Sequence, residues 1–272
     1  DDDDVTDDGS GVEPEPEHII AFGDVHGDYE NTLAVLRQSG VIDDDGHWSI
    51  GETVVVQVGD QLDRGYGEEE ILDLFERLRV EARSAGGAFY ALIGNHETLN
   101  VEGEMDYVFD ESAFGGLAAR TQAFAPGGEW AIRLAKRVTV LQLGESVFVH
   151  GGVRPEYAEV GVETINAEVR RWLTGETPME PDSVYEDEGV VWTRTYSDGN
   201  PGGTGCSELE EALDLMGATR MVVAHTVQDE GINAACEERV WRVDVGIAEY
   251  YDGVIEALEI TGDVVSVIRE NY

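Results

Sequence analysis

Short apolar runs that end in polar loops alternate with helix-like patterns from His18 onward. Each run has the length and the Val, Ile and Phe content of a buried strand. Two of the runs contain turn residues, Gly144-Glu145 and Thr261-Gly262-Asp263, and are therefore predicted to be hairpins. With their loops, the runs occupy residues 18–27, 52–60, 88–97, 137–152, 221–226, 240–247 and 254–268.

The intervening segments show the signals of helices. Residues 28–39 begin with an N-cap, Asp28, and are followed by Gly40, which favours helix termination. Residues 68–87 carry acids in the first turn and apolar side chains at helical spacing. A third helical pattern starts at Ser207 and leads into the run at 221–226. Strands separated by helices indicate an α/β protein, and the late hairpins make the predicted sheet mixed rather than all-parallel.

Charge divides the 272-residue chain into two parts. Its 58 acidic and 17 basic side chains give a formal net charge of -41. Residues 1–17 contain nine of the acids and no base, with alternating Glu and Pro, so we expect an extended acidic tether and order only from His18. Residues 18–272 form the predicted folded domain. Their remaining acids disfavour nucleic acids and anionic membrane surfaces as partners.

Compartment and membrane association are inferred from the tether, the cysteines and the hydropathy. No stretch reaches 18 consecutive apolar residues, so no membrane span is expected. The tether resembles a linker that follows a cleaved secretory or lipoprotein signal. This predicts a periplasmic, cell-envelope or secreted protein, with a lipid anchor ahead of the tether as one form and a cytoplasmic protein as the alternative. Cys206 and Cys236 are compatible with one disulfide, but two cysteines do not decide the question.

Metal-ligand residue types follow five of the strands. The loops are Gly23-Asp24-Val25-His26-Gly27, Gly59-Asp60-Gln61-Leu62-Asp63-Arg64-Gly65, Gly94-Asn95-His96-Glu97, His150-Gly151-Gly152 and Ala224-His225. Loops at the carboxyl ends of strands in an open sheet converge on one site. Asp, Asn and His ligands without a thiolate suit Mn, Fe or Zn rather than a structural zinc cage.

These ordered motifs resemble those of the PPP-type metallophosphatases, within the calcineurin-like metallophosphoesterases. The match covers residues 18–250, and GDVHGDYE, GDQLDRG and the late DVGIAEYY are most similar to the bacterial Shewanella-like protein phosphatases. The resemblance implies a sandwich of two mixed β-sheets flanked by helices. Its implied ligands are Asp24 and His26 for one metal, Asp60 as the bridge, and Asn95, His150 and His225 for the other.

The resemblance also implies the remaining catalytic roles. Arg64 binds the substrate phosphate, with Arg194 as the second arginine and Arg154 as a weaker rival. His96, oriented by Asp63, protonates the leaving oxygen. Glu97 is expected to be a structural carboxylate.

Two divalent cations that share a water lower its pKa, so a bridging hydroxide is the expected nucleophile. Mn is the metal expected to support activity in vitro. The expected substrates are phosphotyrosine or phosphoserine/threonine in proteins, or small phosphomonoesters. The alternatives are a dinucleoside polyphosphate hydrolase and a catalytically silent metal-binding interaction domain. The oligomeric state is left open. Trp192 is expected in the core, and Tyr250 and Tyr251 on opposite faces of a strand-like segment.

Overall fold

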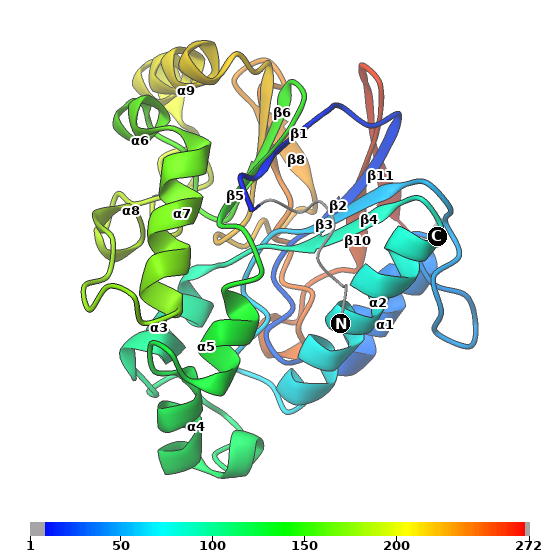
Figure 1. Cartoon of the computed structure of the whole chain (residues 1–272). Helices are drawn as coiled ribbons and strands as arrows, with labels where there is room; N and C mark the ends of the chain where they lie inside the picture. Colours follow the sequence, from blue (N-terminus) through cyan, green and yellow to red (C-terminus); the bar gives the residue numbers. More distant parts are fainter. Residues whose placement is uncertain (1–8, 270–272) are drawn as a thin grey trace.

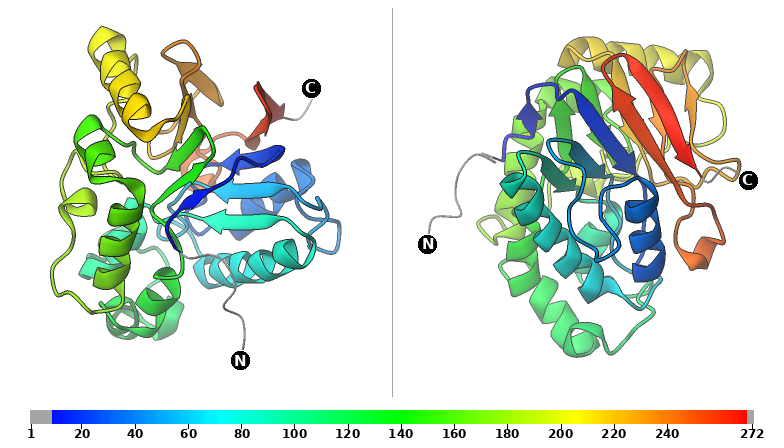
Figure 2. Two further views of the ribbon diagram at one scale, coloured as in Figure 1. Left: turned by 45° about the horizontal axis from the view of Figure 1, so that its top comes forward. Right: turned by 90° about the vertical axis from the view of Figure 1, so that its right-hand side faces the viewer.

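Two mixed β-sheets lie face to face, and helices cover the outer face of each (Figure 1). The computed structural model describes residues 9–269. Figure 2 shows the same layers from two further directions, with α1 and α2 outside one sheet and the longer helices of the second half outside the other. The sequence-based prediction of an α/β sandwich with two mixed sheets is confirmed.

The first sheet has five strands in the order β11-β10-β2-β3-β4. Its three parallel strands are joined through α1 and α2, so residues 18–91 form successive β-α-β units. The late hairpin adds β10 antiparallel to β2, as its turn at Thr261-Gly262-Asp263 predicted. The elements are β2 His18–Phe22, α1 Tyr29–Gln38, β3 Val54–Gln57, α2 Glu68–Ser84, β4 Ala88–Ala91, β10 Glu256–Thr261 and β11 Val264–Arg269.

The second sheet has six strands in the order β1-β5-β6-β7-β9-β8. The predicted hairpin at Gly144-Glu145 joins β5 and β6, and β7 pairs parallel to both β6 and β9. The carboxyl ends of β6 and β7 therefore meet the carboxyl ends of β2 and β3 at one edge of the sandwich. The strands are β1 Val12–Glu13, β5 Val140–Leu143, β6 Ser146–Val149, β7 Arg220–Val223, β8 Asn233–Ala235 and β9 Val240–Arg242.

Several helices lie where the sequence gave no clear helical pattern. They cover the second sheet or close the lower end of the sandwich in Figure 1. Most are short, and short helices carry too few periodic positions to be recognised. They are α3 Asn95–Glu102, α4 Leu117–Phe124, α5 Glu129–Leu134, α6 Pro155–Val160, α7 Val162–Leu173 and α8 Asp182–Tyr185, with 3₁₀ turns at Ala113–Gly115 and Glu249–Tyr251. The helix predicted from Ser207 is present as α9 Gly202–Met216 and begins five residues earlier than expected.

Order begins earlier than His18, so this boundary of the predicted tether is wrong. β1 adds to the edge of β5 in parallel register. Asn166 and Arg170 on α7 donate to the carbonyl oxygens of Ser10 and Gly9, at 2.9 and 2.8 Å. The segment is thus held through its backbone and does not need apolar side chains of its own. Residues 1–8 of the predicted tether lie outside the described residues.

The core has two parts, one on each side of the second sheet. The larger part fills the space between the sheets and continues under α1 and α2, where Phe22 and Phe75 pack with ring centroids 6.3 Å apart. The other part lies between the second sheet and the helices outside it, and contains Ile165, Trp172 and Leu209. Burial on both faces explains why the strands read as continuous apolar runs.

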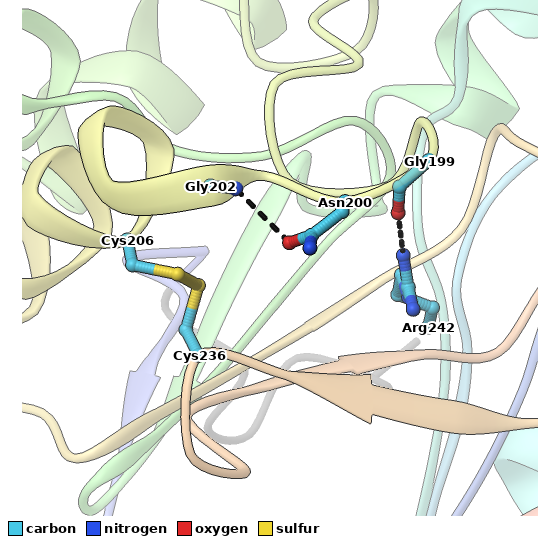
Figure 3. Close-up of a disulfide and its surroundings, with 6 residues drawn as sticks. All are labelled: Gly199, Asn200, Gly202, Cys206, Cys236 and Arg242. Atoms are coloured by element: carbon cyan, nitrogen blue, oxygen red, sulfur yellow. Dashed lines mark hydrogen bonds between the residues drawn. A yellow bond between two sulfur atoms is a disulfide. The ribbon is translucent and has the colours of Figure 1, made fainter.

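A disulfide between Cys206 and Cys236 joins the first turns of α9 to the end of β8 (Figure 3). The cysteines are 30 positions apart, so closure of this loop restricts the unfolded chain by about 3–4 kcal/mol in the entropic account. In the same region the guanidinium of Arg242 donates to the carbonyl of Gly199 at 2.6 Å. These contacts fix the segment between residue 194 and α9. Among the described residues, no helix combines the length and the apolar character needed to cross a bilayer.

Candidate active site

The five predicted loops converge on one cavity of about 230 Å³ at the carboxyl ends of the central strands. Seven of the ten predicted site residues line it. The other three, His26, Asp63 and His150, are buried directly behind them, since each contacts a lining residue. The lining residues are Asp24, Asp60, Arg64, Asn95, His96, Leu99, Tyr107, Trp192, Arg194, His225, Val227 and Tyr251.

Two groups of metal-ligand atoms share Asp60. One group contains His26, Asp60 and His96, and the other contains Asp60, His150 and His225; all are buried, and within each group the ligand atoms lie within 4.8 Å of one another. Nε2 of His150 is 3.2 Å from Oδ2 of Asp60, and Nε2 of His26 is 3.7 Å from the same oxygen. A carboxylate between two such groups is arranged to bridge two cations.

The imidazole hydrogen bonds fit a cation as well. Nδ1 of His26 donates to the carbonyl of Leu62 at 2.9 Å, and Nδ1 of His150 donates to that of Val58 at 2.8 Å. With Nδ1 engaged in this way, each ring turns Nε2 toward Asp60, and a cation that displaced the Nε2 proton would meet a lone pair there, as in metal-binding histidines. Nε2 of His225 is buried and has no hydrogen-bond partner among the described residues. The residues present therefore fit a pair of divalent cations.

The titration of these groups reflects crowding of opposite charges. Burial alone would lower the pKa of His150, but Asp60 and Asp24 raise it to about 10. Burial would raise the pKa of Asp60, yet the neighbouring histidines hold it well below its usual range. Burial and the nearby His150 lower the pKa of His225 well below its ordinary value. The buried carboxylates and imidazoles of the site therefore strongly perturb one another's pKa values.

Left-handed backbone conformations cluster at the site. Five of the ten predicted residues have positive φ, namely His26, Asp60, Asp63, Arg64 and His225, with φ between 38° and 68°. Such conformations are costly for residues with a Cβ and persist where surrounding contacts hold them. Gly59 has φ of 91°, and a Cβ there would lie 2.7 Å from Nδ1 of His150. The loops therefore place the ligand side chains in backbone conformations that are strained for residues with a Cβ.

A buried network orients His96. Nδ1 of His96 lies 2.6 Å from Oδ2 of Asp63. Asn100 donates to both oxygens of Asp63 and to the carbonyl of His96. Arg120, fully buried on α4, donates to Asp63 at 2.9 Å and forms two bonds of 2.6 and 2.7 Å to Glu68. Because both ends of the Asp63 carboxylate are held, the ring of His96 has one orientation, with Nε2 toward the cavity.

Glu97 holds the loop that carries Asp60. Its carboxylate accepts the backbone N–H groups of Gly94, Asp60 and Gln61 at 2.8–2.9 Å and that of Leu62 at 3.2 Å. Burial and the charge of Asp60 raise its pKa to about 7. The expectation of a structural carboxylate agrees with these contacts.

Two arginines and a set of tyrosines form the mouth of the cavity. The guanidinium of Arg64 lies 5.3–5.6 Å from the ring centroids of Tyr107, Tyr250 and Tyr251. Arg194 donates to the carbonyl of His225 at 2.7 Å and to the hydroxyl of Thr226 at 2.8 Å, which positions it at the opposite wall.

Three expectations about residues near the mouth are corrected or refined. Tyr250 and Tyr251 lie on a 3₁₀ turn rather than a strand, because the chain turns after β9, and both rings face Arg64. Trp192 packs against the outer part of the core, as expected, but it is only partly buried and also lines the cavity, and its indole N–H donates to the carbonyl of Val184. Arg154, the rival phosphate ligand, is paired with Glu188 and Glu208 away from the cavity.

Sequence reasoning missed the residues that support the site. Arg120, Asn100 and Glu68 lie on helices, where their residue types normally indicate a solvated face. Asp244, 2% exposed, opens the late DVGIAEYY motif but was assigned no role at the site; burial and the charge of Asp24 raise its pKa well above its usual range. Tyr107 lies in a loop after α3. A buried charge cannot be recognised from one sequence, because its burial depends on partners far along the chain.

Comparison with known proteins agrees with this geometry. Residues 17–229 match the family model described as calcineurin-like phosphoesterase. The chain is 37% identical to Shewanella-like protein phosphatase 2 of Arabidopsis thaliana, over 91% of this chain and 76% of that protein. It is 31% identical to Shewanella-like protein phosphatase 1 of Plasmodium berghei, over 85% of this chain and 67% of that one. The crystal structure of a cold-active protein-tyrosine phosphatase of a psychrophilic Shewanella shares the fold, with a TM-score of 0.76 and 22% identity, over 97% of this chain and 85% of that one.

Proposed function

Because the chain belongs to the calcineurin-like phosphoesterase family, we propose that it is a metal-dependent phosphatase of phosphoproteins, with a preference for phosphotyrosine. The observation that carries the proposal is the convergence of nine chemically matched side chains from five loops, together with Arg194, in and directly behind the lining of one cavity. The relatives that match at 31% and 37% identity are both protein phosphatases by name.

The metal ligands are assigned by contact and donor type. Oxygen and imidazole donors without a thiolate suit Mn, Fe or Zn, and we propose Mn as the metal that supports activity in vitro. Bound cations supply Lewis-acid polarisation of the phosphoryl group and a nucleophile at neutral pH. The residues that would hold the cations are Asp24 and His26 on one side, Asp60 between the two groups, and Asn95, His150 and His225 on the other side; Asp24 contacts His26, and Asn95 contacts His150.

Arg64 and Arg194 bind the phosphoryl oxygens. Both line the cavity, and a planar guanidinium matches two oxygens of a phosphate at once. Arg194 is held from behind by the carbonyl of His225, so its remaining N–H groups can face the cavity. The two arginines stabilise charge that develops on the phosphoryl group during transfer.

His96 holds the proton that the leaving oxygen receives. With Nδ1–H donated to Asp63, the second proton of the imidazolium is at Nε2, which faces the cavity. Burial lowers the pKa of His96, while Asp60 and Asp63 oppose that shift. An acid with a lowered pKa transfers its proton more readily, and Asp63 keeps the ring in the productive orientation.

The aromatic mouth supports the preference for phosphotyrosine. Tyr107, Tyr250 and Tyr251 surround Arg64, and Tyr107 and Tyr250 are 44% and 53% exposed. An aryl phosphate gains ring contacts there that an alkyl phosphate lacks. Each aromatic pair contributes about 0.5–1.5 kcal/mol, so we expect a preference of roughly tenfold rather than absolute selectivity.

A substrate panel tests the proposal. The metal-loaded protein is assayed on matched phosphotyrosyl and phosphoseryl peptides and on a dinucleoside polyphosphate. We expect turnover of both peptides with Mn, loss with chelator, and higher kcat/KM for phosphotyrosine. Turnover of the dinucleotide alone favours the hydrolase alternative, and no turnover with any divalent metal favours the silent domain.

Tyr250→Leu should reduce the tyrosine preference without changing metal content; an unchanged preference contradicts the role of the aromatic mouth.

We also propose that the protein works in an oxidising compartment, in the periplasm, the cell envelope or secreted. The disulfide between Cys206 and Cys236 supports this, because such bonds persist where thiols are not kept reduced. Thiol labelling of the protein in intact source cells tests the assignment. We expect no labelling of the two cysteines, and full labelling would indicate a reducing compartment.

A further inference from the structure

Four of the few basic side chains surround a second cavity that shares no residue with the catalytic one. The cavity has a volume of about 240 Å³ and lies beside α2, β4 and the segment before β5. Its basic residues are Arg79, Arg83, Lys136 and Arg137, and Lys136 is the single lysine of the chain. A random gathering of four bases is unexpected in a chain with 58 acids and 17 bases.

Three of these cations lack a carboxylate partner. For Arg79, Lys136 and Arg137, the structure gives no ion pair within residues 9–269. Glu76, an acid close to these cations, is instead paired with Arg133 at 2.8 Å. Glu13 also lines the cavity, where the four cations outnumber this one carboxylate.

Arg137 is fixed in place without a direct ion pair in residues 9–269, although Glu97 and Glu76 act on its charge from a distance. Its guanidinium donates to the side-chain oxygen of Gln61, a neutral acceptor. Burial lowers its pKa to about 10, so it remains a cation at neutral pH. The backbone N–H of Gln61 donates to the carboxylate of Glu97 at 2.9 Å, which fixes the residue that holds Arg137. A cation held by a neutral group keeps its charge available and loses little freedom when an anion binds.

We propose that this cavity is an anion site for a small oxyanion, of phosphate or carboxylate type, separate from the catalytic centre. Four guanidinium and ammonium groups around one cavity outnumber its single lining carboxylate, Glu13, and such groups stabilise a dianion by charge-assisted hydrogen bonds. A water molecule occupies about 30 Å³ of liquid, so the cavity holds a phosphate-sized ion together with several waters. Phe89 and Ala91 form an apolar wall that strengthens these charges by excluding solvent.

The oxyanion has two possible sources. One is a free phosphate-type ion, which the proposed reaction would itself release. The other is the chain, because Asp1–Asp8 contains six aspartates and precedes β1, whose Glu13 lines the cavity. The chemistry of recognition is the same for both, and the experiment below distinguishes them.

The test measures binding of inorganic phosphate to the metal-loaded protein by calorimetry, so its outcome does not depend on turnover. The catalytic site is weakened by Arg64→Gln, and the second site by the double variant Arg79→Gln/Lys136→Gln. We expect Arg64→Gln to retain one binding event and the double variant, combined with Arg64→Gln, to weaken that event roughly tenfold or more. Retained affinity in the combined variant, or loss of all binding in Arg64→Gln alone, overturns the proposal.

A charge-matched control separates the cavity from the overall charge of the protein. Arg171→Gln/Arg239→Gln removes two half-exposed cations elsewhere and should leave the event within about twofold, since distant charges are screened by salt. An equal loss in this control contradicts a local site.

The source of the oxyanion is assigned by replacing the six aspartates of Asp1–Asp8 with asparagine. Tighter phosphate binding then identifies the chain as the competing source, and unchanged binding identifies the free ion.

Discussion

The catalytic centre consists of two regions that differ in how the chain builds them. The inner region lies on strand-end loops and the first turn of α3, carries the motifs, and places five residues at positive φ. The outer region lies on helices and contains Arg120, Glu68, Asn100 and Glu97, all buried and hydrogen-bonded. The inner side chains present atoms to the cavity, whereas the outer ones bond to the inner residues or their backbone.

The difference separates chemistry from positioning. Loops at strand ends can turn sharply and bring five segments together, but they are strained and have no regular backbone hydrogen bonds. The helices supply rigid carboxylates and a guanidinium that restrain the loops. Replacement of an inner residue should therefore reduce metal binding and rate, and replacement of an outer residue should reduce stability first and rate second.

The largest effect is expected from Asp60→Asn in the inner region. This carboxylate belongs to both metal-ligand groups, so its loss should lower bound metal and reduce kcat/KM about 10³-fold. Metal content by elemental analysis and kcat/KM on an aryl phosphate measure the two effects. Asp106→Asn, on an exposed loop, is the matched control. Full metal content and near-normal rate in Asp60→Asn would contradict the assignment of the bridge.

The next effect is expected from Arg120→Met in the outer region. The change leaves Asp63 and Glu68 as unpaired buried carboxylates, which costs about 3–5 kcal/mol of unfolding free energy. At a temperature where the variant is folded, kcat should fall about 10- to 100-fold, because His96 loses its orientation. Urea unfolding and steady-state kinetics measure these outcomes.

Two variants control for the loss of an arginine. Arg133→Met removes a partly exposed arginine paired with Asp73 and Glu76 and should cost about 1 kcal/mol or less. Adding Glu68→Gln to Arg120→Met should restore part of the stability, since one buried charge is removed. Equal costs for Arg120→Met and Arg133→Met would show that the buried network does not support the site as described.

The same division explains what the sequence revealed. Asp24, Asp60 and Asn95 were recognisable because each follows an apolar run at a spacing of 35–36 residues, which is one β-α-β unit. Arg120 was not recognisable, because nothing in the sequence around an arginine in a short helix indicates that its side chain is fully buried. The strand at Val12–Glu13 was missed for a related reason: its stability comes from β5 and α7, more than 125 residues away.

The smallest effect is expected far from the cavity, at Glu81 on α2. Its carboxylate accepts from the amide of Trp48 at 2.8 Å and from Arg77 at 2.8 Å, and these contacts outweigh burial and lower its pKa to about 2. Since the folded pKa lies below the ordinary value of 4.5, the contribution is present above about pH 4.5 and is lost as the pH falls toward 2.

Glu81→Gln should therefore lower the free energy of unfolding at pH 7 by about 1 kcal/mol or less, with a matching fall in Tm. The value of kcat should not change. The difference in unfolding free energy between the variant and the unmodified protein should shrink below pH 4.5. Thermal unfolding at several pH values measures this. A fall in kcat at pH 7 would show that charges remote from the cavity act on the chemistry as well.

The central claim, that the outer region positions His96 as the acid for the leaving oxygen, is tested by the dependence on the leaving group. kcat/KM is measured for the unmodified protein and for His96→Asn on aryl phosphates whose leaving phenols span a wide range of pKa. The account predicts a loss of about 10²- to 10⁴-fold for poor leaving groups that shrinks steadily as the phenol becomes more acidic, with metal content unchanged. An equal loss for every leaving group would contradict it.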